Sequence, residues 1–127
     1  MKLSRSVSCF LPSASLFALK FLNWGFNVFV LRYSCAPHRY PVQLREVAAV
    51  FEEIYANVNE WHCDTTKIGI IGFSAGGHLV AHYSNAYNCD DVRKVFPNSK
   101  QPNFSVLCYP VISADETFAH KGSFQNL

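Results

Sequence analysis

The amino-acid sequence predicts an α/β fold, in which helices alternate with the strands of a mostly parallel sheet. Three observations lead to this prediction. Helix-like and strand-like segments alternate along the chain, the strand-like segments are almost continuously apolar, and 127 residues suffice for about one small domain. Strands that are covered by helices on both faces have this continuous apolar character.

The N-terminal half contains two expected helices and one expected strand. Residues 14–24 carry apolar side chains at helical spacing, and Asn23 and Gly25 form a plausible helix stop. Residues 26–33 (FNVFVLRY) are too short for a buried helix and predict a strand covered on both faces. After a loop that contains two prolines, residues 42–60 predict the clearest helix, whose apolar face consists of Leu44, Val47, Ala48, Phe51, Ile54, Tyr55 and Val58.

The C-terminal half repeats this alternation. A turn at residues 61–66 leads into an expected strand at 67–73 and an expected helix at 75–88. Residues 89–103 are interpreted as a loop with room for a short helical turn, and 104–113 as a third strand that ends near Pro110. Strands joined in this way through helices predict parallel pairing with right-handed crossovers.

Composition excludes several classes of protein. Half of the residues are apolar, which excludes disorder, and the net charge of +2 includes no Lys/Arg run, which argues against a nucleic-acid partner. The five cysteines are odd in number and too widely spaced for a zinc site or a disulfide framework. They predict buried or free thiols in a reducing compartment and therefore a cytoplasmic location. These cysteines are Cys9, Cys35, Cys63, Cys89 and Cys108.

The N-terminus loosely resembles a signal peptide, because Lys2 and Arg5 precede an apolar stretch. Serines and Pro12 interrupt that stretch, and no clean cleavage site follows it, so we expect no working signal. No run approaches the roughly 20 apolar residues that cross a bilayer, so no membrane partner is expected.

Ser74 is the candidate catalytic residue. It stands at the expected end of a buried strand, directly before a helix, within Gly72-Phe73-Ser74-Ala75-Gly76. Functional groups gather at the carboxyl ends of parallel strands, and Gly-x-Ser-x-Gly in this context is typical of a nucleophile elbow. The hydroxyl of Ser74 would project from a sharp turn, and the Ala75 amide at the helix N-terminus would help to hold an oxyanion.

Three other interpretations compete for this glycine-rich stretch. A dinucleotide-binding loop requires the spacing G-x-G-x-x-G, and a P-loop requires G-K-[ST]; both patterns are absent. An inert serine in a structural strand–helix turn remains open, because Gly-x-Ser-x-Gly alone occurs by chance.

A longer pattern resembles the α/β-hydrolase fold. The segments GFNVFVLRYSCAP, YP, KIGIIGFSAGGHL, YPVIS and HKGS follow one another as they do in that fold. Within it, the chain is similar to the acetyl-esterase and acetylxylan-esterase-like serine hydrolases. The resemblance covers residues 14–127 and leaves 1–13 unassigned. It implies part of a three-layer sandwich, with three to four strands of the mostly parallel sheet present.

The resemblance also implies a reaction. The family's nucleophile falls on Ser74, which would form an acyl-enzyme, and the oxyanion amide falls on Ala75. The expected substrate is a small ester or an acetylated carbohydrate, with no cofactor and no metal.

The sequence departs from the family in its other catalytic parts. The segment VSCFLPSAS stands where relatives have a glycine-rich oxyanion loop, and the chain ends before the strands that carry the triad Asp and His. Asp115 and His120 are possible local substitutes, although His120 would have to fold back over Ser74. His78 and His82 share one helix face, where packing and hydrogen bonding are the expected roles.

The expected sheet also has a gap. In the family a third strand separates the strands that 26–33 and 67–73 resemble, and only residues 5–11 could weakly fill it. We therefore expect a fragment of a hydrolase, and the alternative function is that of a catalytically incomplete or non-catalytic remnant. Open sheet edges predict self-association.

Overall fold

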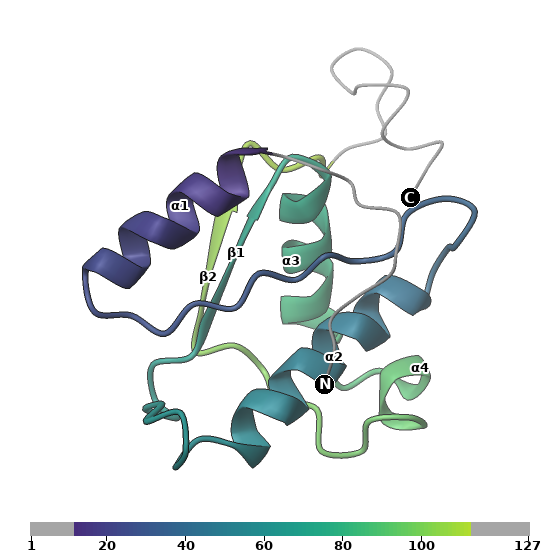
Figure 1. The fold of residues 1–127 in the computed structure, drawn as a ribbon. Helices are drawn as coiled ribbons and strands as arrows, with labels where there is room; N and C mark the ends of the chain where they lie inside the picture. The colour runs from purple at the N-terminus through teal and green to yellow at the C-terminus, as the bar shows by residue number, and fades with distance from the viewer. Residues whose placement is uncertain (1–11, 113–127) are drawn as a thin grey trace.

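The computed structural model describes residues 12–112, which form a small parallel sheet with helices packed around it (Figure 1). Strands β1 (Gly69–Phe73) and β2 (Phe104–Cys108) pair in parallel, with Gly69 opposite Phe104 and Phe73 opposite Cys108. The chain between them forms α3 (Ala75–Ala86) and α4 (Asp90–Arg93). This strand–helix–strand unit confirms the predicted α/β class and the parallel pairing.

Helix α2 (Val42–Ala56) supplies most of the core. Its buried residues recur every three or four positions, as the amphipathic pattern predicted, and they pack with residues of α3 and α4. The predicted helix was four residues too long, because the Asn57 side-chain amide donates to the Glu53 carbonyl oxygen at 2.8 Å and ends the helix. The buried cluster comprises Leu44, Val47, Ala48, Phe51, Leu79, Tyr83 and Val92.

Helix α1 (Pro12–Asn23) lies on the other side of the sheet from α3 (Figure 1). It stops where the sequence predicted, since Gly25 adopts a φ of 87° and donates its N–H to the Leu22 carbonyl oxygen at 3.0 Å. Its contact with the sheet includes the rings of Phe17 and Phe73, whose centroids lie 4.9 Å apart.

The predicted strand at 26–33 is wrong. This segment runs as an extended chain across the molecule and forms no strand in the described structure (Figure 1). Phe26 and Phe29 are 53% and 42% exposed, so the segment is not covered on both faces. A strand exists through its ladder of hydrogen bonds, and residues 12–112 offer no third strand between this segment and β1. The described sheet therefore has two strands where three to four were predicted.

The other boundaries shifted by a few residues. β2 ends at Cys108, two residues before the predicted end near Pro110, because Tyr109 takes a φ of 37° and Pro110 has no N–H to donate. The predicted short helical turn between residues 89 and 103 is confirmed as α4. Residues 5–11, which could have filled the gap in the sheet, lie outside the described residues.

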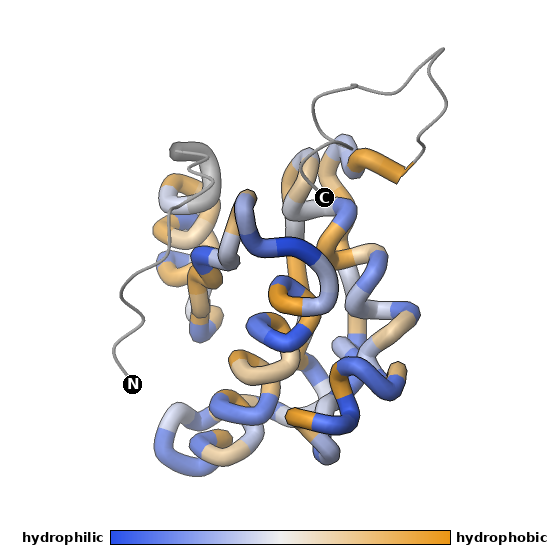
Figure 2. Tube along the Cα trace, turned by 90° about the vertical axis from the view of Figure 1, so that its right-hand side faces the viewer, coloured by the Kyte–Doolittle hydropathy of each residue, from blue (hydrophilic) through white to orange (hydrophobic). Residues whose placement is uncertain are grey.

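Hydrophobic side chains are not confined to the core. Figure 2 shows hydrophobic stretches on α1 as well as in the centre of the molecule. In the described part of the chain, no helix is long and apolar enough to span a bilayer. The large apolar residues that remain exposed on α1 and β2 include Leu16, Leu19, Leu22, Phe104, Val106 and Leu107.

Candidate active site

Ser74 occupies the sharp turn that the sequence predicted. β1 ends at Phe73, α3 begins at Ala75, and the single residue between them has φ 51° and ψ −118°. Residues with a side chain rarely adopt a positive φ, and this region of backbone space is populated mainly by glycine. The predicted strained strand-to-helix turn is therefore confirmed, while the chemical role of Ser74 stays a prediction.

Main-chain hydrogen bonds hold the turn on both sides. The Ser74 N–H donates to the Cys108 carbonyl oxygen at 3.0 Å, which extends the β1–β2 ladder by one residue. The Ser74 carbonyl oxygen accepts from the His78 N–H at 3.1 Å, in the first turn of α3, and from the Val111 N–H at 3.4 Å. Strand, helix and the segment after β2 thus all meet at this residue.

Two neighbouring glycines permit this close packing. A Cβ on Gly72 would lie 2.2 Å from the Gly76 carbonyl oxygen, and one on Gly77 would lie 3.0 Å from the Pro110 Cα atom. At Gly76, by contrast, a Cβ would meet only the Tyr33 side chain, at 3.7 Å. Close packing of strand, helix and the segment after β2 therefore requires glycine at positions 72 and 77, whereas position 76 has room for a side chain.

Ala75 is the first residue of α3. Backbone N–H groups in the first turn of a helix have no acceptor within the helix, and the helix dipole favours negative charge there. The Ala75 amide thus stands in the environment that an oxyanion donor needs, directly after Ser74. Its participation in catalysis remains a prediction.

The two histidines of α3 make packing and hydrogen-bonding contacts, as expected. Nδ1 of His78 lies 2.7 Å from the Val111 carbonyl oxygen, and the His78 and His82 rings meet edge to face at 5.9 Å. The His82 ring stacks on Tyr40 at 5.6 Å. Burial, with a smaller effect from His78, lowers the pKa of His82. No local pattern predicted the contact with Tyr40, because Tyr40 lies in a loop about forty residues away.

A triad is not assembled within residues 12–112. The candidate substitutes Asp115 and His120 lie outside the described residues. Among the residues that the structure describes, no group of three His, Cys, Asp or Glu side chains is arranged to hold a metal ion.

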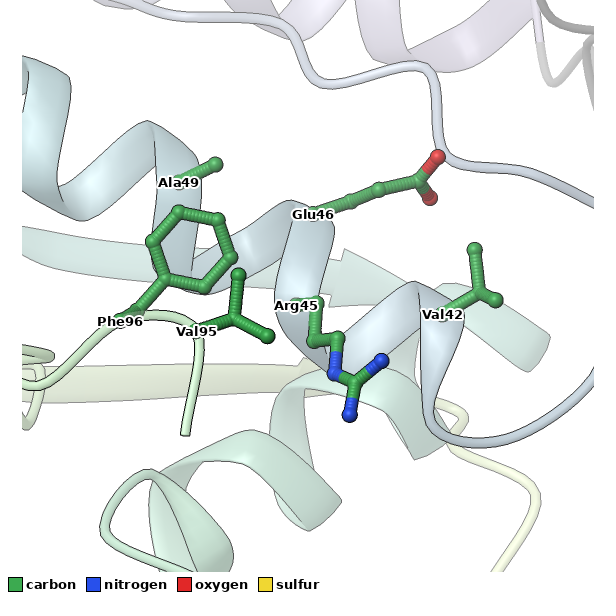
Figure 3. Close-up of a pocket in the computed structure, with 6 residues that line it drawn as sticks. All are labelled: Val42, Arg45, Glu46, Ala49, Val95 and Phe96. Carbon is green, nitrogen blue, oxygen red and sulfur yellow. The ribbon is translucent and has the colours of Figure 1, made fainter. Parts of the chain in front are cut away.

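A shallow pocket lies away from Ser74. It has a volume of about 250 Å³ and is formed by α2 and the chain after α4, as Figure 3 shows. The charged groups in its wall are already engaged: Arg45 donates to the Asp91 carbonyl oxygen, and Glu46 accepts from Ser34. The pocket shares no residue with the elbow. Its lining consists of Val42, Arg45, Glu46, Ala49, Val95 and Phe96.

Comparison with known proteins identifies relatives among hydrolases. An acetylxylan esterase of Xylanibacter ruminicola is 34% identical over 102 residues, which cover 80% of this chain and 19% of the relative. The crystal structure of an acetyl ester-xyloside bifunctional hydrolase from Caldicellulosiruptor lactoaceticus is 35% identical, with a TM-score of 0.72. The match covers 88% of this chain and 42% of that one.

A third relative extends the structural match. A lipase/esterase from Lactobacillus plantarum has a TM-score of 0.76 at 25% identity, over 92% of this chain and 51% of that chain. The chain thus spans about a fifth of the length of the acetylxylan esterase and about half or less of the two solved structures.

A family profile described as the alpha/beta hydrolase fold matches residues 22–126, which include both strands and the elbow. Together with the parallel strand–turn–helix unit around Ser74, this match shows that the chain belongs to the α/β-hydrolase family.

Proposed function

We propose that Ser74 is the nucleophile of a carboxylic-ester hydrolase. The observation that carries the proposal is the backbone of Ser74, whose φ of 51° is forced between a parallel strand and a helix. A strained conformation persists only where the surrounding structure imposes it, and such residues cluster at active sites. An inert structural turn would be served better by glycine, which adopts this conformation without strain.

The proposed reaction is acyl transfer through the serine. The Ser74 oxygen attacks the ester carbonyl carbon, and the hydroxyl proton passes to a base while negative charge collects on the carbonyl oxygen. The Ala75 amide donates to that oxyanion. The alcohol leaves with a proton, and water then releases the carboxylic acid and restores the serine.

The proposed substrates are acetyl esters of small alcohols and of sugars. Support comes from the relatives, which are named as an acetylxylan esterase and an acetyl ester-xyloside hydrolase.

Two further properties belong to the proposal. The first is self-association through open strand edges. The second is a cytoplasmic location, which is based on the odd number and wide spacing of the cysteines.

Hydrolysis of p-nitrophenyl acetate tests the proposal. The full chain should hydrolyse this ester about 10⁴-fold more slowly than an intact relative, because no base is assigned to Ser74. The part of the residual rate that passes through an acyl-serine should disappear in Ser74→Ala. Ser84→Ala is the matched control, since this serine lies on the same helix and its hydroxyl bonds to the Val80 carbonyl oxygen.

The outcomes separate the two candidate functions. Equal rates for the unchanged chain and Ser74→Ala would show that Ser74 is not a nucleophile in this chain and would favour a non-catalytic remnant. A rate close to that of such a relative, abolished by Ser74→Ala, would indicate that this chain supplies a base for Ser74.

A further inference from the structure

The segment that follows β2 wraps closely around the elbow. Tyr109 turns the chain with a φ of 37°, and Pro110 then packs against Gly77 of α3. Val111 next donates its N–H to the Ser74 carbonyl oxygen. This segment thus leaves the carboxyl end of the sheet beside the candidate nucleophile, at the edge where an ester would have to approach.

The side chain of His78 contacts the carbonyl oxygen of Val111. Nδ1 of His78 lies 2.7 Å from the Val111 carbonyl oxygen. A carbonyl oxygen only accepts hydrogen bonds, so Nδ1 of the imidazole must carry the proton. His78 is also the residue whose own N–H bonds to the Ser74 carbonyl oxygen. Backbone and side chain of one residue therefore link α3, the elbow and the segment after β2.

We infer that His78 is a positioning residue for Ser74. By donating from Nδ1 it fixes Val111, and Val111 in turn braces the Ser74 carbonyl against the turn. This inference rests on the proposed function, because bracing the turn matters for chemistry only where the serine reacts. The inferred role requires a donor at the Nδ1 position and does not require an imidazole.

That requirement defines a sharp pair of variants. In His78→Asn the side-chain amide nitrogen can occupy nearly the position of Nδ1 and can still donate to Val111. In His78→Gln the amide lies one carbon further out, close to the position of Nε2, and misses that carbonyl. The matched control is His82→Gln, because His82 lies on the same helix as His78 and its ring stacks on Tyr40.

The experiment combines NMR and hydrogen exchange on the full chain. In the unchanged chain at mildly alkaline pH, ¹⁵N shifts should show His78 as the Nδ1–H tautomer. Exchange of the Val111 amide should be about three- to tenfold faster in His78→Gln, which is the effect of losing one net hydrogen bond. It should stay unchanged in His78→Asn and in His82→Gln.

The rate of p-nitrophenyl acetate hydrolysis supplies the second readout. It should fall in His78→Gln and recover in His78→Asn. An Nε2–H tautomer, or equal Val111 exchange in the Asn and Gln variants, would overturn the positioning role. If Ser74 proves unreactive in every variant, the tautomer and the exchange rates still decide the contacts of His78, and only the proposed function fails.

Discussion

At the scale of single residues, the turn at Ser74 depends on neighbouring glycines, which have no side chain. Gly72 allows β1 and α3 to approach so closely that a single added carbon would reach the Gly76 carbonyl oxygen. Gly77 does the same for Pro110. The hydroxyl of Ser74 is thus held at the end of β1 by close backbone packing on both sides of the turn.

Substitution of the two motif glycines should have opposite consequences. Gly72→Ala places a carbon 2.2 Å from a backbone oxygen that cannot move freely, so it should lower the free energy of unfolding by about 1–3 kcal/mol or more. Gly76→Ala, in the first turn of α3, meets only ordinary contact and should be neutral or stabilising by up to about 1 kcal/mol. Urea denaturation of the two variants measures both values, and equal losses would contradict the packing described here.

Tyr40 offers a test of whether its loop contacts α4. Its hydroxyl donates to a carboxylate oxygen of Asp91 at 2.8 Å, and that hydrogen bond raises the pKa of Tyr40 from 10.0 to about 12. The folded-state pKa is raised, so the stabilisation from this bond is complete below pH 10.0 and is lost as the pH rises through about 12.

Phenolate absorbance measures this titration. The difference between the unchanged chain and Tyr40→Phe isolates Tyr40, whose midpoint should lie near 12. Asp91→Ala should return the midpoint toward 10.0. A midpoint near 10.0 in the unchanged chain would mean that the loop does not rest on α4 in solution.

At the scale of elements, the helices differ in what they bury. α2 places five residues in the core, whereas α1 keeps most of its large apolar side chains exposed. Phe51 of α2 is 3% exposed and stacks on Tyr83, and Leu19 of α1 is 59% exposed. The stability of the chain therefore depends on α2 far more than on α1.

A matched pair of truncations measures that difference. Phe51→Ala should lower the free energy of unfolding by about 3–5 kcal/mol, because it leaves a cavity in the core. Leu19→Ala should change it by about 0.5 kcal/mol or less. Urea denaturation at low protein concentration is the measurement, and a large loss in Leu19→Ala would show that α1 is buried in solution.

The same contrast explains how much the sequence could predict. The face of α2, the stop of α1 at Gly25 and the turn at Ser74 all follow from local patterns, and the structure confirms them. The strand at 26–33 failed because strand pairing depends on a neighbour elsewhere in the chain, which a local pattern does not reveal. The contact of His78 with Val111 was also out of reach, since it joins residues 33 positions apart.

At the scale of the whole molecule, the described sheet is open. Within residues 12–112 it has two strands, so each strand pairs along one edge only. Three residues of β2, Phe104, Val106 and Leu107, are exposed. Apolar strands with unpaired N–H and C=O groups provide a template for association with another chain.

We therefore expect the purified chain to self-associate and to melt without one steep transition. Size-exclusion chromatography should show an apparent mass that rises with concentration, and thermal unfolding should be broad. Val106→Lys places a charge on β2 and should shift the chain toward the monomer. Val95→Lys should not, although Val95, beyond α4, is 51% exposed and Val106 is 42% exposed. A clean monomer with a single sharp unfolding step would show that the sheet is closed in solution.

The left-handed turn at Ser74 also has a consequence for chirality. A φ of 51° suits an achiral residue, so the L-configured Cβ of serine makes the native fold less stable than the sequence would otherwise allow. Both variants lack the hydroxyl, but the free energy of unfolding of Ser74→Gly should exceed that of Ser74→Ala by about 1 kcal/mol or more. Ser74 is thus a chiral residue in a conformation that suits glycine better, and what it adds over glycine at the end of β1 is a hydroxyl group.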